Sequence, residues 1–233
     1  MLVRRLVQLY VGLWLYGLSG ALQVSAGLGL DPWDVLHQGV SHHIGLRIGT
    51  VVIVVGALVL LLWIPLRQRP GLGTVSNVVL VGVSMNVGLD ILPAHAPLGW
   101  RIAELVGGVV LCGVASGMYI GAEFGPGPRD GLMTGLARRT GRSIRLVRTS
   151  LEVTVLAAGW LLGGQVGVGT VAFALAIGPL AQVFLPLFAI ERPATTRRPR
   201  RRGPARWRSG RRPSRTPGGR RRTPAGDRPT TPA

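Results

Sequence analysis

Two acidic residues occupy matching places in two short polar inserts of an otherwise apolar chain. Asp34 lies in the insert at residues 27–47 and Asp130 in the insert at residues 123–143, each two residues after a proline. Asp31 is placed to cap a short helix whose first position suits Pro32, and an acid near that end is stabilised by the helix dipole. If both inserts dip into a membrane, the two carboxylates approach each other and can hold a cation or a proton. If the inserts lie flat, the acids only stabilise helix starts.

Two carboxamides form a second matched pair inside apolar runs. Asn86 and Gln182 are candidate cavity residues, because polar side chains within a membrane usually face the bundle interior or a cavity. Hydrogen bonding between helices without any ligand explains them equally well. Arg148 and Glu152, four residues apart near a helix end, are expected to pair with each other.

These matches follow from a tandem duplication with an offset of 96 residues, which separates Arg5 from Arg101 and Asp34 from Asp130. The first copy is expected at residues 1–95 and the second at residues 96–190. Each copy carries a stripe of small residues at every fourth position, a spacing that allows close helix contact in lipid. The stripes consist of Gly17, Ala21, Ser25 and Gly29 and of Gly113, Gly117, Gly121 and Gly125. We expect the two helices that carry them to cross.

Composition indicates an all-α polytopic membrane protein. Apolar residues make up 47% of the 233 residues, and mean hydropathy is +0.38. Six transmembrane helices are predicted, three in each copy, with a short polar or re-entrant helix after the first span of each. The predicted spans are residues 6–26, 48–66, 72–92, 102–122, 144–162 and 166–190. Because three is odd, the copies must have inverted topology.

Charge placement sets the orientation. Most arginines outside the tail lie near one set of helix ends, so the positive-inside rule predicts cytoplasmic N- and C-termini in the plasma membrane. Residues 191–233 hold 15 Arg against two acids and almost no apolar residues, which indicates a disordered cytoplasmic tail. That tail can bind anionic lipid headgroups, and we expect no specific nucleic acid. Because the apolar stretch at residues 6–26 recurs at residues 102–122, it is interpreted as a retained helix and not as a signal peptide.

The residue types that catalysis or metal binding requires are not found in a suitable pattern. No nucleophile with a base, phosphate-binding loop or dinucleotide motif is present, so we expect no enzyme and no cofactor. His37, His42 and His43 do not share a helical face and have no matching cysteines, so we expect no metal site. Cys112 is the single cysteine, which excludes an internal disulfide.

Three motifs resemble a known family. Arg-Leu-x-Gln-Leu-Tyr-x-Gly at residues 5–12, Gly-Leu-Gly-x-Asp-Pro-Trp-Asp-Val-Leu at 27–36 and Gly-Pro-Gly-Pro-Arg-Asp-Gly-Leu at 125–132 are similar to the YczE branch of the bacterial YczE/YyaS/YitT group of membrane proteins. The resemblance covers about residues 4–190. It implies a plasma-membrane protein with a transport-like or regulatory role, and it carries over no catalytic residues. The soluble C-terminal domain of YitT-like members is absent from this sequence.

Two functional hypotheses follow. The first is a small-solute or ion permease or exporter that works by alternating access of inverted repeats, with Asp34, Asp130, Asn86 and Gln182 as cavity residues. The second is a non-transporting scaffold or regulator that contacts a protein partner through the loop at residues 123–143 and the basic tail. A weaker third hypothesis is kinship with major-facilitator transporters. Residues 135–142 of this chain resemble the cytoplasmic loop of those proteins.

Overall fold

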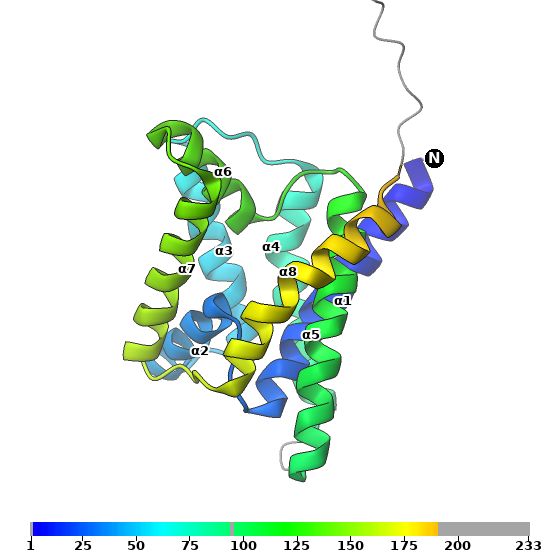
Figure 1. Ribbon diagram of the computed structural model, residues 1–233, viewed down its shortest axis with the longest axis vertical. Helices are drawn as coiled ribbons and strands as arrows, with labels where there is room; N and C mark the ends of the chain where they lie inside the picture. Colours follow the sequence, from blue (N-terminus) through cyan, green and yellow to red (C-terminus); the bar gives the residue numbers. More distant parts are fainter. Residues whose placement is uncertain (1, 94–95, 191–233) are drawn as a thin grey trace, which may run out of the picture. The chain divides into compact units, whose positions relative to one another are not determined.

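Eight α-helices make up the part of the chain that the structure, a computed structural model, describes (Figure 1). That part is residues 2–93 and 96–190, so the predicted disordered tail at 191–233 lies outside the described residues. The helices are α1 (Leu2–Ala26), α2 (Pro32–Ile44), α3 (Ile48–Trp63), α4 (Leu72–Ile91), α5 (Leu98–Gly121), α6 (Pro128–Thr140), α7 (Ile144–Leu161) and α8 (Val168–Phe188). A helix lies in each of the six predicted spans and in both inserts. Each helix of the first half begins 96 residues before its counterpart in the second.

The first helices of the two halves, α1 and α5, lie side by side and run antiparallel. Near the start of α1, Arg5 Nη2 donates to the carbonyl of Ala122 at the end of α5 (2.8 Å). Near the start of α5, Arg101 Nε donates to the carbonyl of Ala26 at the end of α1 (2.6 Å). The last carbonyls of a helix have no partner within it. Each arginine therefore caps the end of the opposite helix.

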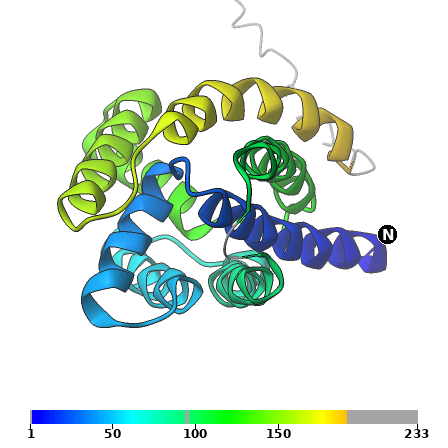
Figure 2. The same cartoon turned by 90° about the horizontal axis from the view of Figure 1, so that it is seen from below.

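Within α1 and α5, the glycines and the alanine of the two small-residue stripes pack against the last helix of their own half. Ser25 is the exception, because its hydroxyl donates to Glu104 of α5 (3.2 Å). A Cβ at Gly17 would lie 2.7 Å from Ser84 Cβ of α4, and one at Gly117 would lie 2.7 Å from the carbonyl of Phe184 of α8. The contact between α1 and α5 uses other small residues, among them Gly12. Figure 2 shows α1 (blue) between α4 (teal) and α5 (green), with α8 (yellow to orange) along the outer side of α5.

Close backbone contacts also connect the loop after α1 with the start of α8, and the loop after α5 with the start of α4. A Cβ at Gly29 would lie 2.6 Å from the backbone nitrogen of Gly167, and one at Gly125 would lie 3.2 Å from Cα of Gly71. Both loop glycines have positive φ, +115° and +121°, which disfavours any other residue. The two halves thus make the same contact on each other.

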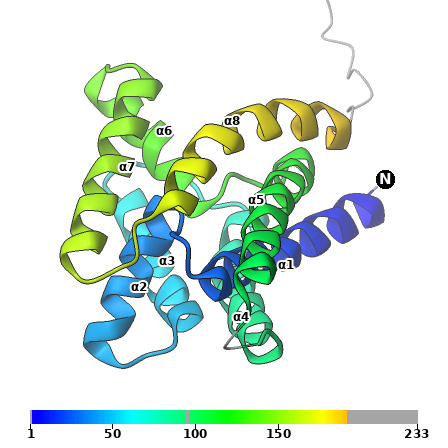
Figure 3. The ribbon, with the colours of Figure 1, turned by 60° about the horizontal axis from the view of Figure 1, so that its bottom comes forward.

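The short helices pack on the opposite half as well: α2 contacts α7, and α6 contacts α3 (Figures 1 and 3). Gly159 of α7 lies against the backbone of Leu36, and Gly131 of α6 lies against the ring of Trp63. Trp63 Nε1 also donates to the carbonyl of Pro128 (3.0 Å). These contacts hold the N-terminal ends of α2 and α6 inside the helix bundle.

Three helices, α4, α5 and α8, are long and apolar enough to cross a membrane, and α2 with α3 forms a fourth candidate bent by 111°. By itself α3 has 16 residues, about 24 Å at 1.5 Å per residue, which is shorter than the hydrocarbon core of about 30 Å. Many large apolar side chains on the outside are exposed, such as Leu61, Trp160 and Leu175. A helical membrane bundle accounts for this apolar exterior.

The contact between Gly117 and α8 predicts a position-specific effect of side-chain size. Gly117→Leu should strongly destabilise the fold, by about 1–3 kcal/mol or more, because the side chain meets the backbone of Phe184. Gly107→Leu on the same helix should stay within about 0.5 kcal/mol, because nothing lies within 4 Å of that site. Thermal unfolding of the purified protein in detergent measures both. Equal losses for the two variants would contradict the packing.

Candidate functional site

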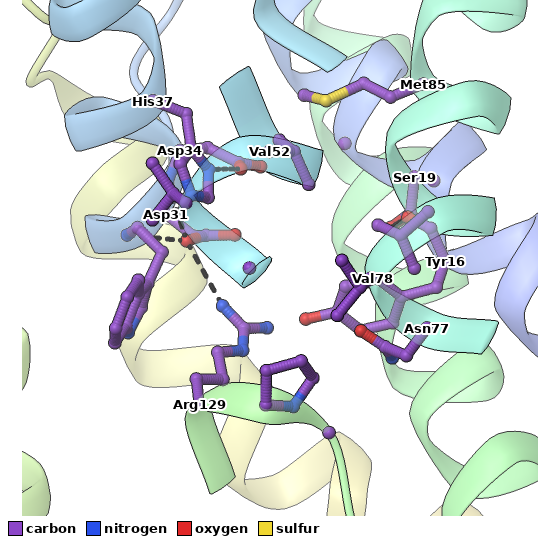
Figure 4. A pocket seen from close by; sticks show the side chains of 18 of the residues that line it. Tyr16, Ser19, Asp31, Asp34, His37, Val52, Asn77, Val78, Met85 and Arg129 are labelled. Atoms are coloured by element: carbon purple, nitrogen blue, oxygen red, sulfur yellow. Dashed lines mark hydrogen bonds and ion pairs between the residues drawn. The ribbon is translucent and has the colours of Figure 1, made fainter. Parts of the chain in front are cut away.

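A cavity of about 70 Å³ lies inside the bundle, where α1, α2, α3 and α4 meet the start of α6 (Figure 4). Charged side chains from both halves of the chain line it. From the first half come Asp31, Asp34 and His37, and from the second half comes Arg129. The volume admits a few water molecules or one small ion.

Asp31 places the start of α2 at the cavity. Its carboxylate caps the helix by accepting from the backbone nitrogens of Trp33 (2.9 Å) and Asp34 (3.1 Å), and Pro32 occupies the first turn. The residue is 4% exposed. The predicted cap at Asp31 is confirmed, and the same residue contributes its charge to the cavity.

Asp34 stands one turn further along α2. Its Oδ1 lies 3.0 Å from His37 Nδ1. Its Oδ2 reaches α1, where a Cβ at Gly20 would lie 3.3 Å from it. Asp34 and His37 therefore form a hydrogen-bonded pair at the cavity wall, and the absence of a side chain at Gly20 makes room for the carboxylate.

Arg129 comes from the first turn of α6 and completes the charged cluster. Its Nη1 lies 3.6 Å from Asp31 Oδ1, and its guanidinium lies 5.4 Å from the centre of the Tyr16 ring. The side chain is 29% exposed, whereas that of Asp31 is 6% exposed. By the 96-residue offset, Arg129 occupies the place that Trp33 has in the first half. The cavity is thus charged differently on its two sides.

Burial raises the pKa of Asp31, and the negative charge of Asp34 raises it further. Asp31 consequently keeps its proton to a higher pH than an exposed aspartate does. When it is ionised, Arg129 is the cation beside it. The lining thus holds two carboxyl groups, those of Asp31 and Asp34, and one guanidinium, that of Arg129.

Two buried polar atoms on lining residues find no hydrogen-bond partner among the described residues: Gln23 Oε1, an acceptor, and Trp33 Nε1, a donor. Gln23 is 1% exposed and Trp33 7% exposed. Buried polar groups are nearly always paired with protein or ordered water. Two lining residues thus carry a buried polar atom, one acceptor and one donor, that no described protein group satisfies.

The second predicted acid, Asp130, lies beside the cavity and not on its lining. Its Oδ2 accepts from the hydroxyl of Tyr119 (3.0 Å), and it sits near Gly127, where a Cβ would be 3.2 Å away. Tyr119 and Gly127 do line the cavity. The structure thus brings both Pro-Asp turns to one place, with Asp34 at the cavity and Asp130 held one side chain behind it.

The predicted carboxamides lie elsewhere. Asn86 Oδ1 accepts from the backbone nitrogen of Gly49 (3.0 Å), so it connects α4 to α3. Gln182 is exposed on α8. Neither belongs to the cavity lining. The expected pair of Arg148 and Glu152 is confirmed, at 2.9 Å.

Sequence reasoning missed Arg129 and Gln23 and assigned Asp31 only a capping role. One signal was available: the second Pro-Asp turn carries an arginine where the first carries Trp33, so the duplication had diverged in charge there. Within residues 2–93 and 96–190, no three His, Cys, Asp or Glu side chains cluster closely enough to hold a metal ion.

A family of unknown function, DUF6198, matches residues 3–186. The chain belongs to this family. Its relatives include an uncharacterized protein of Haemophilus influenzae, 39% identical over 78% of this chain and 83% of the relative. The uncharacterized membrane protein YczE of Bacillus subtilis is 37% identical over 73% of this chain and 80% of its own length.

The uncharacterized protein YyaS of Bacillus subtilis is 26% identical over 76% of this chain and 90% of its own length. No solved structure matches the chain. The resemblance to the YczE and YyaS proteins is thereby confirmed, and the family match covers both halves of the helix bundle. Together with the apolar helices, this identifies a helical membrane protein.

The ion pair between Asp31 and Arg129 predicts a stability cost. Arg129→Gln should lower the free energy of unfolding by about 1–3 kcal/mol, because it leaves the carboxyl of Asp31 buried without its cation. Arg148→Gln, which breaks an exposed pair, should cost less than about 1 kcal/mol. Thermal or denaturant unfolding in detergent measures both.

A double variant isolates the charge from the helix cap. Asparagine caps a helix as well as aspartate, so Asp31→Asn removes only the charge. The pair Asp31→Asn/Arg129→Gln should cost less than the sum of the two single changes. Strict additivity would show that the two groups do not interact.

Proposed function

We propose that this protein is a small permease for a cation or for protons, built from two inverted three-span repeats, and that Asp31, Asp34, His37 and Arg129 form its binding site. The observation that carries the proposal is the buried, charged cavity at which the starts of α2 and α6 meet. Transporters built from repeats place their sites where broken helices of the two halves meet. Ionisable groups inside a membrane protein usually mark an ion or proton path.

The reciprocal contacts support the inverted arrangement. Equivalent helices α1 and α5 run antiparallel, and Arg5 and Arg101 make the same cap on opposite ends. With α1, α3, α4, α5, α7 and α8 as spans, an odd number per half turns the second repeat over. The arginine distribution supports an orientation with both termini in the cytoplasm.

The size and charge of the cavity select the class of solute. About 70 Å³ fits one small ion or a few waters, and two carboxyl groups beside a single guanidinium favour a cation when both carboxyls are ionised. The carboxyl of Asp31 can take up a proton, because burial raises its pKa. Loss of that proton would leave a negative site, and its return would release the cation.

A second candidate is a membrane scaffold or regulator that contacts a protein through its loop and tail. The observation in its favour is a basic surface at the turn between α6 and α7, where Arg138 and Arg142 line a shallow hollow. This function predicts that changes at the cavity are silent and that changes at this surface are not.

Flux measurements on the full chain distinguish the two. The protein is reconstituted into liposomes with a trapped pH-sensitive dye, and gradients of sodium, potassium, ammonium or pH are imposed. We expect at least one gradient to dissipate faster than in protein-free liposomes, and Asp34→Asn to abolish the difference, because it removes the negative charge at the cavity.

Asp90→Asn is the matched control, because Asp90 is an exposed acid paired with Arg47 away from the cavity and should leave flux unchanged. The permease proposal fails if folded protein dissipates no gradient. It fails also if Asp34→Asn transports like the unmodified chain.

A further inference from the structure

The last two spans of each half differ in packing although their sequences are related by the duplication. In the first half, α3 and α4 are closely packed. Any side chain at Gly82 would collide with the backbone carbonyl of Gly49, and Asn86 accepts a hydrogen bond from the same residue. Val78 extends this contact, 3.3 Å from where a Cβ at Gly56 would lie.

In the second half, the same face of α8 is uncovered. Its residues equivalent to Val78, Gly82 and Asn86 are Ala174, Gly178 and Gln182. All three are exposed, and no atom lies within 4 Å of a Cβ at Gly178. Among the described residues, α7 and α8 barely touch.

The facing helix α7 has also changed in character. Where α3 carries Gly49, Ile53 and Gly56, α7 carries Arg145, Thr149 and Glu152. Arg145 and Thr149 are exposed, and Glu152 is partly exposed in its pair with Arg148. A charged helix face is costly in contact with lipid, and so is an uncovered amide such as Gln182. The face of α7 is instead suited to water, and α8 adds one polar side chain, Gln182, beside the small residues Ala174 and Gly178.

This polar region extends toward the cavity. Arg148 and Glu152 are close enough for their charges to act on Arg129, whose own guanidinium lies at the cavity. The polar region also lies toward one end of the bundle, the end at which α1 begins and α8 ends. These two helix ends are adjacent, because Gln8 Nε2 donates to the carbonyl of Phe188 (2.9 Å). In Figure 1, α7 and α8 diverge toward this end.

We propose that the exposed faces of α7 and α8 form a water-filled entrance to the cavity, and that the contact between α3 and α4 is the closed form of the same entrance at the other end. This inference rests on the proposed function, because it describes the path to that binding site. The structure then corresponds to a state that is open toward the end holding the N-terminus of α1. In the opposite state, α8 would close on α7 through Gly178 while Gly82 separates from Gly49.

Labelling with a membrane-impermeant thiol reagent tests the entrance. Single cysteines are introduced in the full chain with Cys112 replaced by alanine, and labelling is followed in inside-out and right-side-out vesicles. Thr149→Cys and Gln182→Cys should react from the cytoplasmic side. Their equivalents in the closed pair, Ile53→Cys and Asn86→Cys, should react at least about tenfold more slowly from either side, since thiolates form in water and not in a packed helix contact.

Leu187→Cys is the control for depth. Leu187 is exposed on α8 and lies nearer than Gln182 to the helix end, but on a different face. It should react more slowly than Gln182→Cys, because it faces lipid. The contact between α3 and α4 is probed at two sites, Ile53 and Asn86, so that a packing defect in one variant does not decide the result.

Three results would overturn the entrance. Gln182→Cys could react no faster than Leu187→Cys, which would place lipid on this face. Two copies of Gln182→Cys could form a disulfide with each other, which would make the face a dimer contact. Asn86→Cys and Ile53→Cys could both react as fast as their counterparts.

Labelling needs no flux, so the two proposals can fail separately. A water-accessible entrance without measurable transport would refute the proposed function alone, and transport without labelling would refute the entrance alone.

Discussion

The fold depends on close backbone contact between helices that are far apart in the sequence. In lipid, apolar side chains gain little by leaving their surroundings, so packing and hydrogen bonding between helices must hold the bundle together. The chain meets this constraint with glycine at the contact points, as where Gly17 meets α4 and Gly117 meets α8. The unpaired carbonyls at the ends of α5 and α1 accept hydrogen bonds from Arg5 and Arg101, each of which comes from the other half.

These reciprocal contacts explain why a cavity can exist. Because α2 packs on α7 and α6 packs on α3, each short helix is held by the half to which it does not belong. Their N-terminal ends are thereby brought to one place, with Asp31 from one half 3.6 Å from Arg129 of the other. A bundle whose short helices packed only on their own half would have no reason to bring these charges together.

Much of the helical framework could be predicted from the sequence, because the duplication doubles every signal. All eight helices, the cap at Asp31 and the Arg148–Glu152 pair follow from local patterns. The partner of each stripe could not be predicted, because a small residue at every fourth position specifies a close contact without specifying which helix makes it. The six-span count and the inverted topology stay predictions.

The composition of the site was harder to predict for a related reason. Symmetry directs attention to residues that match, such as Asp34 and Asp130. Two other charged residues of the cavity, Asp31 and Arg129, stand at positions that do not match, since their counterparts are Gly127 and Trp33. The same holds for the spans, where glycines and apolar residues of α3 correspond to charged and polar residues of α7. In a duplicated membrane protein, conserved symmetry maintains the scaffold, since both halves must satisfy the same packing constraints. Departures from symmetry in charge are costly within a membrane, and in this chain they lie at the cavity and on α7.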